Sequence, residues 1–308
     1  MDATGEAAAG RMTEAGATPA AREPVGGAVR AGRVRWTRRL LRNRNVVIGA
    51  GIFLLLLAAA VLAPLISTHV PTRLTPANRL KPPSRQHFLG TDEFGRDVYS
   101  LVVYGSRVSL LVGGVTMLIT SVGGIFIGLM AGYYRRLDLL IMRVMDGLMA
   151  FPAILLAIAF MAARGPGVWN VIVALSLVYM PRTALLIRAT VLSLRELDYV
   201  QAARALGRRD LAVAFGHILP NCMAPLLVQG TFIFAYAVLA EAILGFLGVG
   251  VPPYVPSWGN VIASGKNVIR EAFWVSLFPG ITLTVAGLSL NLLGDGLRDT
   301  LDPRLRVQ

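Results

Sequence analysis

Long apolar runs separated by short basic segments form the main pattern of this chain. The first run, residues 46–66, holds 21 residues and no charged side chain. A helix rises 1.5 Å per residue, so this run spans about 30 Å, the thickness of a bilayer's hydrocarbon core. In lipid a helix satisfies its own backbone hydrogen bonds. Similar runs predict five more spans at about 108–132, 147–163, 168–187, 219–240 and 272–293.

Composition supports lipid as the solvent for these runs. Hydrophobic residues make up 55% of the 308 residues and charged residues 15%, and the mean hydropathy is +0.62. An average soluble domain carries about 25% charged residues. The sequence therefore predicts an all-α integral membrane protein with six transmembrane helices.

The basic residues indicate the orientation of the spans. With a cytoplasmic N-terminus, the inside segments 1–45, 133–146, 182–218 and 295–308 hold 21 of the 30 Lys and Arg residues, and the outside segments hold 9. Cytoplasmic loops are enriched in Lys and Arg. Both termini are therefore predicted to be cytoplasmic, and the net charge of +13 favours membrane topology over nucleic-acid binding.

The same pattern divides the chain into segments. Residues 1–45 lack an apolar period and predict a disordered, basic cytoplasmic tail. The first span, 46–66, is followed by an extracytoplasmic loop, 67–106. A core at 107–295 contains the other five spans and a cytoplasmic loop at 188–218, and a cytoplasmic tail at 296–308 ends the chain.

Sequence motifs for catalysis or metal binding are absent from the chain. The single Cys222 excludes an intramolecular disulfide and a thiolate metal cluster. The three histidines, His69, His87 and His217, lie far apart in sequence and show no metal-ligand spacing. HExxH, GxSxG and a phosphate-binding loop are also missing. We therefore expect no catalytic residue, no metal and no cofactor in this chain.

The cytoplasmic loop contains two helix-forming segments. Residues 198–206 favour a helix that Gly207 ends, and residues 208–215 favour a second one before Pro220. Ala202, Ala203 and Leu206 are predicted to form a small apolar face ringed by arginines. Two interpretations stay open: an amphipathic helix on anionic lipid, or a protrusion that docks in a groove of a soluble partner.

The same loop carries a resemblance to a known family. Gln201-Ala202-Ala203, then Gly207, then Ile218 and Pro220 resemble the coupling loop of ABC-transporter membrane subunits, with Gln201 where the family has Glu. Further segments are similar to the second permease subunit of dipeptide, oligopeptide and glutathione importers, over about residues 35–305. They are residues 87–98 (HFLGTDEFGRDV), 105–110 (GSRVSL), 132–134 (GYY), 151–152 (FP), 246–248 (FLG), 252–253 (PP), 257–259 (SWG) and 291–304 (NLLGDGLRDTLDPR).

The resemblance implies a type I ABC importer permease in the bacterial inner membrane that translocates short peptides; nickel importers share much of the pattern. It implies four kinds of partner: a homologous second permease, two ATPase subunits that use ATP and Mg, an extracytoplasmic solute-binding protein and the lipid bilayer. The residues that would form the ATPase-coupling segment are Tyr199, Gln201, Ala202, Ala203, Arg204, Gly207, Arg208, Arg209 and Asp210. Positive-inside topology alone is the alternative role for these arginines.

Two charged residues near the spans are candidates for the translocation pathway. Arg182 lies toward the inner end of the fourth span and Glu241 at the outer end of the fifth. Helix-end anchoring or pairing is the alternative for both. A stand-alone ion-coupled carrier is the rival function, and transport by the purified chain alone would identify it.

Two glycine-containing segments carry structural expectations. Gly124, Gly128 and Gly132 recur every four positions and predict a flat helix face for close approach of another helix. Packing within the chain is favoured there over a subunit interface. The outside segment 87–97 predicts a structured turn, which would either contact the binding protein or clamp the chain's own helices.

Overall fold

The computed structural model describes residues 40–301, and these residues are mainly helical. The described part contains no named strand, and its one isolated antiparallel bridge joins Thr91 and Asp97. Most of the predicted N-terminal tail, and residues 302–308 of the predicted C-terminal tail, lie outside the described residues. The predicted all-helical class is confirmed for the part described.

Five helical segments in the described part are long and apolar enough to cross a membrane. They are α2 (Arg44–Val61), α4 (Val98–Tyr133), α7 (Val168–Leu194), the segment Asp210–Phe246 that includes α10 (Leu219–Phe246), and α12 (Trp274–Leu301). The shorter elements are α3 (Ala63–Ile66), η1 (Pro76–Asn78), α5 (Arg135–Met149), α6 (Ala153–Arg164), α8 (Asp198–Ala205), α9 (Asp210–Val213), the π-helical turn η2 (Ala214–Ile218), α11 (Trp258–Gly265) and η3 (Lys266–Val268).

The predicted third span, 147–163, is not one straight helix. It covers the end of α5 and most of α6, and these two helices meet at an angle of 90°. Pro152 stands at the break, where a proline disfavours helical backbone at the residue before it. The 12 residues of α6 extend only about 18 Å. The described part of the chain therefore has five candidate spans, or six if α5 and α6 together form one.

Several helices run past the predicted span boundaries. α4 contains 36 residues, about 54 Å, and begins at Val98 because the Asp97 carboxylate accepts a hydrogen bond from the Ser100 amide at 2.9 Å. Residues 98–106 of the predicted outer loop are thus helical. α7 continues to Leu194 and α12 to Leu301. Hydropathy marks the lipid-facing length of a helix and not its polar extensions.

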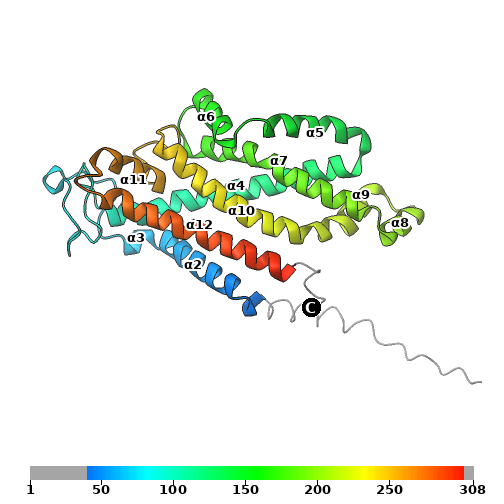
Figure 1. Cartoon of the computed structure of the whole chain (residues 1–308), viewed down its shortest axis with the longest axis horizontal. Helices are drawn as coiled ribbons and strands as arrows, with labels where there is room; N and C mark the ends of the chain where they lie inside the picture. The colour runs from blue at the N-terminus through cyan, green and yellow to red at the C-terminus, as the bar shows by residue number, and fades with distance from the viewer. Residues whose placement is uncertain (1–39, 302–308) are drawn as a thin grey trace, which may run out of the picture. The chain divides into compact units, whose positions relative to one another are not determined.

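The glycine-rich face of α4 packs against α7, as the four-residue spacing predicted. A methyl group built on Gly124 would lie 2.6 Å from the Thr183 side chain, and one on Gly128 would lie 2.6 Å from the Ala184 carbonyl oxygen. The two helices lie side by side through the centre of the bundle (Figure 1). The stripe therefore serves packing within the chain.

The N-terminal and C-terminal helices of the described part also form a close pair. α2 runs along α12 in Figure 1. A methyl group built on Gly49 would lie 2.7 Å from the backbone of Ser289 and Leu293, and the Asn43 amide donates a hydrogen bond to the Gly296 carbonyl oxygen at 3.2 Å. The first span is therefore packed on the core and not a separate anchor.

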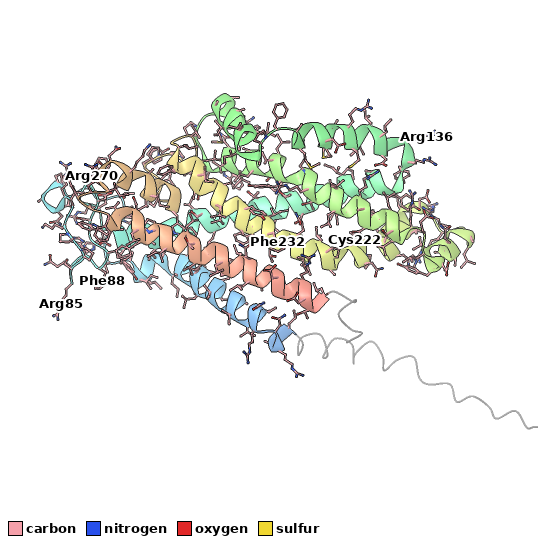
Figure 2. All side chains as sticks on the ribbon, in the orientation of Figure 1. Arg85, Phe88, Arg136, Cys222, Phe232 and Arg270 are labelled. Atoms are coloured by element: carbon pink, nitrogen blue, oxygen red, sulfur yellow. The ribbon has the colours of Figure 1, made fainter. Side chains whose placement is uncertain are left out.

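The segments predicted outside and inside lie at opposite ends of this bundle. At one end, the Trp274 indole donates to the Thr91 carbonyl at 3.2 Å, and the Gly167 amide donates to the Gly250 carbonyl at 3.2 Å. The other end carries α8, α9 and the turn between α4 and α5 (Figure 1). Figure 2 shows Arg85, Phe88 and Arg270 at the first end and Arg136 at the second. The loops predicted outside and inside alternate along the chain, which agrees with their positions at the two ends of the bundle.

Candidate functional site

The predicted coupling segment is a short helix that ends in a tight turn. After α8 the Gly207 amide donates to the Arg204 carbonyl at 2.9 Å, and the Arg208 amide donates to the Ala203 carbonyl at 3.2 Å. This pair of bonds is a Schellman helix end, which needs a left-handed residue. Gly207 supplies it with φ +77°. The predicted helix-ending role of Gly207 is confirmed.

A buried apolar cluster holds this segment rigidly on the transmembrane helices. Val200 of α8, Val213 of α9 and Ile218 of η2 are fully buried and pack with Ile187 and Val191 of α7. Burying aliphatic side chains of this size stabilises the packed state by about 1.5–3 kcal/mol each. The segment is thus a fixed protrusion at its end of the bundle and not a loose loop.

A polar bridge joins both halves of the protrusion to the end of α4. The Tyr133 hydroxyl donates to the Asp210 carboxylate at 2.6 Å, and the Arg204 Nε donates to the Tyr133 hydroxyl oxygen at 3.3 Å. The Arg204 guanidinium also lies 4.8 Å from the centre of the Tyr133 ring, a cation–π distance. Arg204 and Asp210 therefore brace the protrusion internally. Sequence reasoning missed Tyr133, whose only signal was its place in the segment GYY.

The other predicted coupling residues lie at the protein surface. Gln201 donates to the Arg195 carbonyl at 3.1 Å, and Arg208 lies 2.7 Å from the Nε2 atom of His217. Tyr199, Ala202 and Arg209 are exposed, and the Tyr199 hydroxyl accepts a 3.4 Å hydrogen bond from the Asn221 amide.

The predicted apolar face of the protrusion is split in the structure. Ala203 packs inward against the buried cluster, whereas Leu206 is 87% exposed. Two further apolar side chains are exposed nearby in sequence, Leu211 and Phe215, and the sequence analysis did not single them out. The protrusion thus presents apolar side chains together with Arg208 and Arg209 to its surroundings.

A basic concavity of about 670 Å³ adjoins the protrusion. It is lined by Tyr133, Tyr134, Arg135, Arg136, Leu137, Arg204, Arg208 and Asp210. Four arginines and one acid give it a net positive lining, so it favours anionic or polar groups.

Arg182 lies on an exposed surface near the middle of the 27-residue α7, and so deeper along its helix than the sequence analysis expected. It lines a cavity of about 550 Å³ with Gln229, Phe232 and Tyr236 of α10, and three aliphatic residues complete the lining. Within residues 40–301 no carboxylate forms a salt bridge with Arg182. A charged side chain is costly against lipid, by about 2.5–3.5 kcal/mol at the bilayer midplane on insertion scales, and this cost favours water or a partner protein beside Arg182.

Glu241 occupies a different environment from Arg182. It is fully buried, and one of its carboxyl oxygens accepts the Ser109 hydroxyl at 2.8 Å. The Trp258 amide donates to the same Ser109 oxygen at 3.2 Å, so this contact connects α4, α10 and α11. Glu241 does not line the cavity beside Arg182. Its hydrogen bond to Ser109 supports the alternative of anchoring or pairing and gives no support to a pathway role.

Comparisons with known proteins place this geometry in context. Residues 124–307 match the family described as binding-protein-dependent transport system inner membrane component, and residues 34–83 match the N-terminal transmembrane domain of oligopeptide transport permease C. The relatives bear out the resemblance carried by the sequence motifs. A Brucella suis biovar 1 protein named as a peptide transport system permease is 52% identical over 271 residues, 88% of this chain and 92% of that protein.

Two further relatives and one solved structure agree with these matches. The dipeptide permease DppC of Alkalihalophilus pseudofirmus is 42% identical and the glutathione permease GsiD of Pectobacterium atrosepticum is 39% identical; each alignment covers 87% of this chain and about 90% of the relative. The inward-facing MetNI methionine ABC transporter has a chain similar in fold, with a TM-score of 0.53 at 19% identity, over 65% of this chain and 96% of that one.

Proposed function

This chain belongs to the family of binding-protein-dependent transport system inner membrane components and is a permease of a peptide-type ABC importer, and we propose that its α8–α9 protrusion docks on a separate ATPase subunit. Movement of the ATPase would then be transmitted to α4 and α7. The observation that carries the proposal is the protrusion itself. It is rigidly packed and bridged to α4 through Tyr133, yet it exposes Leu206 to 87%.

The remaining assignments of topology and partners belong to the same proposal. Both termini would be cytoplasmic, because α8, the start of α2 and the end of α12 share one end of the bundle and the predicted inside segments are rich in arginine. A homologous second permease, two ATPase subunits that use ATP and Mg, and an external binding protein would complete the importer. ATP hydrolysis then takes place outside this chain.

Arg182 supports a proposal for the translocation pathway. Its surface on α7, with Gln229 and Tyr236, would face the second permease across a water-filled path, because an unpaired arginine is costly against lipid. Arg182→Gln is expected to slow peptide transport while ATPase stimulation persists. Arg42→Gln, which removes an exposed arginine before α2, is the matched control.

A substitution at the exposed tip tests the docking role. Leu206→Asp leaves the buried cluster intact but places a charge where an apolar contact with the ATPase is proposed. In the reconstituted importer we expect peptide uptake and the stimulation of ATP hydrolysis by loaded binding protein to be lost. Leu74→Asp is the control, because Leu74 is 61% exposed at the opposite end of the bundle.

Two outcomes would contradict the proposal. Unchanged uptake in the Leu206→Asp importer would remove the docking role of the protrusion. Gradient-driven peptide uptake by this chain alone in liposomes would identify a stand-alone carrier and refute dependence on separate ATPases.

A further inference from the structure

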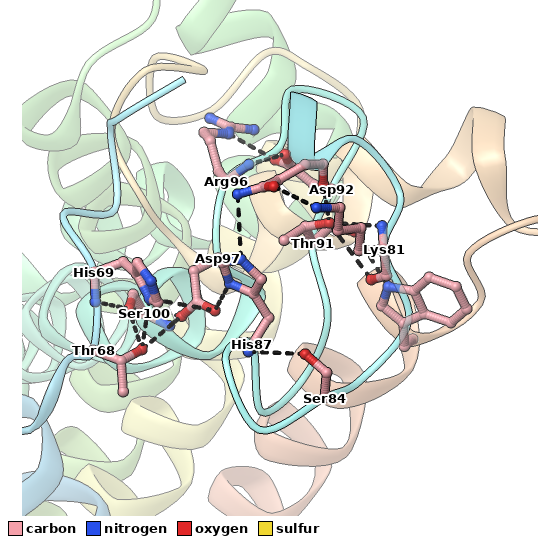
Figure 3. A network of polar contacts seen from close by, with 12 residues as sticks. Thr68, His69, Lys81, Ser84, His87, Thr91, Asp92, Arg96, Asp97 and Ser100 are labelled. Carbon is pink, nitrogen blue, oxygen red and sulfur yellow. Dashed lines mark hydrogen bonds and ion pairs between the residues drawn. The ribbon is translucent and has the colours of Figure 1, made fainter. Parts of the chain in front are cut away.

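The fold brings together two histidines and an aspartate that are separated in sequence. His69 follows α3, His87 lies in the outer loop, and Asp97 caps α4 (Figure 3). The His87 Nδ1 atom lies 2.9 Å from Asp97 Oδ1, and the His69 Nδ1 atom lies 3.8 Å from the same oxygen. One ligand atom from each of the three residues lies within 4.8 Å of the others. Sequence spacing predicted no such set, because the contact forms only when the loop folds back on α4.

The Asp97 carboxylate is oriented so that one oxygen faces the imidazoles. Its Oδ2 atom accepts hydrogen bonds from the Ser100 amide at 2.9 Å, the Ser100 hydroxyl at 2.8 Å and the Thr68 hydroxyl at 3.1 Å. Its Oδ1 atom lies toward His87 and His69. Fixed outer contacts of this kind hold a ligating carboxylate in metal sites.

Access from solvent also suits a metal ligand set. The Asp97 and His87 side chains are 1% and 7% exposed, whereas His69 is 44% exposed and leaves an entry from solvent.

We propose that His69, His87 and Asp97 bind a divalent transition-metal ion of the zinc class. Two imidazoles and one carboxylate are ligands that zinc accepts, with water in a fourth position. Bonds of about 2.0–2.2 Å in a tetrahedral site place ligand atoms about 3.3–3.6 Å apart. The distances of 2.9 and 3.8 Å to Asp97 lie on either side of that spacing, so on metal binding His87 would move slightly away from the Asp97 carboxylate and the exposed His69 slightly toward it.

A bound ion would fasten the outer end of the first span to the start of α4. His69 lies a few residues beyond α3, and Asp97 immediately precedes Val98. The ion would therefore cross-link the first span to the core at the end of the bundle opposite the protrusion. This role is independent of the proposed peptide pathway.

Zinc binding by the purified full-length chain, with any affinity tag removed, tests the site. Competition with a chromophoric chelator is expected to give one Zn²⁺ per chain. His69→Ala is expected to weaken affinity by at least about tenfold, since even outer-shell changes cost 10–100-fold. His217→Ala removes the third histidine, at the other end of the bundle, and is expected to leave zinc affinity unchanged.

Further measurements separate a metal site from a hydrogen-bonded cluster. Co²⁺ is expected to give a visible d–d spectrum in the wild-type chain that His69→Ala abolishes. His69→Gln keeps a polar side chain on the exposed segment and should show the same loss of metal with an unchanged thermal midpoint without metal. Absence of submillimolar zinc binding, or equal binding in the His69 and His217 variants, would overturn the proposal.

Discussion

The turn at Gly207 offers the sharpest test of how the protrusion transmits force. A methyl group built there meets no heavy atom within 4 Å, so replacement by alanine changes only the backbone energy. An L-residue held in the left-handed region costs about 1–2 kcal/mol. That cost raises the population of other turn conformations about 5–30-fold. Gly207→Ala should therefore weaken docking without disturbing the buried cluster beneath it.

Proline and asparagine at the same position extend the series. Proline fixes φ near −65°, whereas Gly207 has φ +77°, and proline also removes the amide that donates to the Arg204 carbonyl. The combined cost is about 3 kcal/mol or more. Asparagine tolerates the left-handed region better than other residues with a side chain. Coupling between ATP hydrolysis and transport is expected to be strongest with glycine at position 207 and to weaken in the order asparagine, alanine and proline.

The assay is the number of peptides transported per ATP hydrolysed by the reconstituted importer. Gly51→Ala is the matched control, because Gly51 lies within α2 and a methyl group there also meets nothing within 4 Å. Insertion of the Gly207→Pro chain should stay close to wild type. The exposed turn can rearrange to relieve the strain, so the loss should be confined to the turn and should not open the buried cluster. A wild-type transport ratio in the Gly207→Pro importer would refute the reasoning.

Three further substitutions test the packing around the protrusion. Tyr133→Phe removes the hydroxyl that donates to Asp210 and should cost about 1.5–3 kcal/mol locally, seen as faster hydrogen exchange in α8 and α9. Gly128→Leu overpacks the contact with α7 and should lower the free energy of unfolding by about 1–3 kcal/mol, which is measured as a lower thermal midpoint. Asp138→Ala breaks the bidentate ion pair with Arg188, costs about 1–3 kcal/mol, and should speed proteolysis of α5.

Each of these substitutions has a control and a result that would count against it. Tyr254→Phe changes a tyrosine that is 75% exposed, and equal exchange in both tyrosine variants would contradict the bridge. Gly280→Leu is the control for Gly128→Leu. No atom lies within 4 Å of a methyl group built on Gly280, so the thermal midpoint of this variant should stay at the wild-type value. The double variant that lacks both Asp138 and Arg188 should lose little more stability than Asp138→Ala alone, because the two side chains form one ion pair. Additive losses would mean that the two side chains act independently.

Local sequence signals predicted the transmembrane helices because lipid requires long uncharged runs. The runs at 46–66, 168–187, 219–240 and 272–293 all fall within or close to observed helices. The boundaries were less predictable. α4 begins at Val98 because of a cap, and the break between α5 and α6 depends on a proline whose effect the apolar pattern does not reveal.

The candidate site shows the same division between features that local sequence signals predict and features that depend on distant residues. Gly207 could be assigned from sequence, because a glycine after a helix-forming segment is a local signal. Arg204 faces Tyr133 and Ala203 faces the buried cluster, whereas Leu206 faces outward. An eight-residue helix cannot show by itself which of its sides meets the bundle. The neighbour that decides the orientation, Tyr133, lies 71 positions from Arg204.

The sequence by itself determined the solvent of this protein, its helix-forming segments and the turn at Gly207, because these depend on hydrophobic length and on local backbone preference. Its family was identified from the resemblance of its motifs to those of known permeases. Only the tertiary structure decided that Arg182 lies exposed beside Gln229, that Glu241 is buried against Ser109, and that His69 and His87 meet Asp97. These contacts join residues from different helices and loops. Their distances are set by how the helices pack, which the order of residues along one segment does not contain.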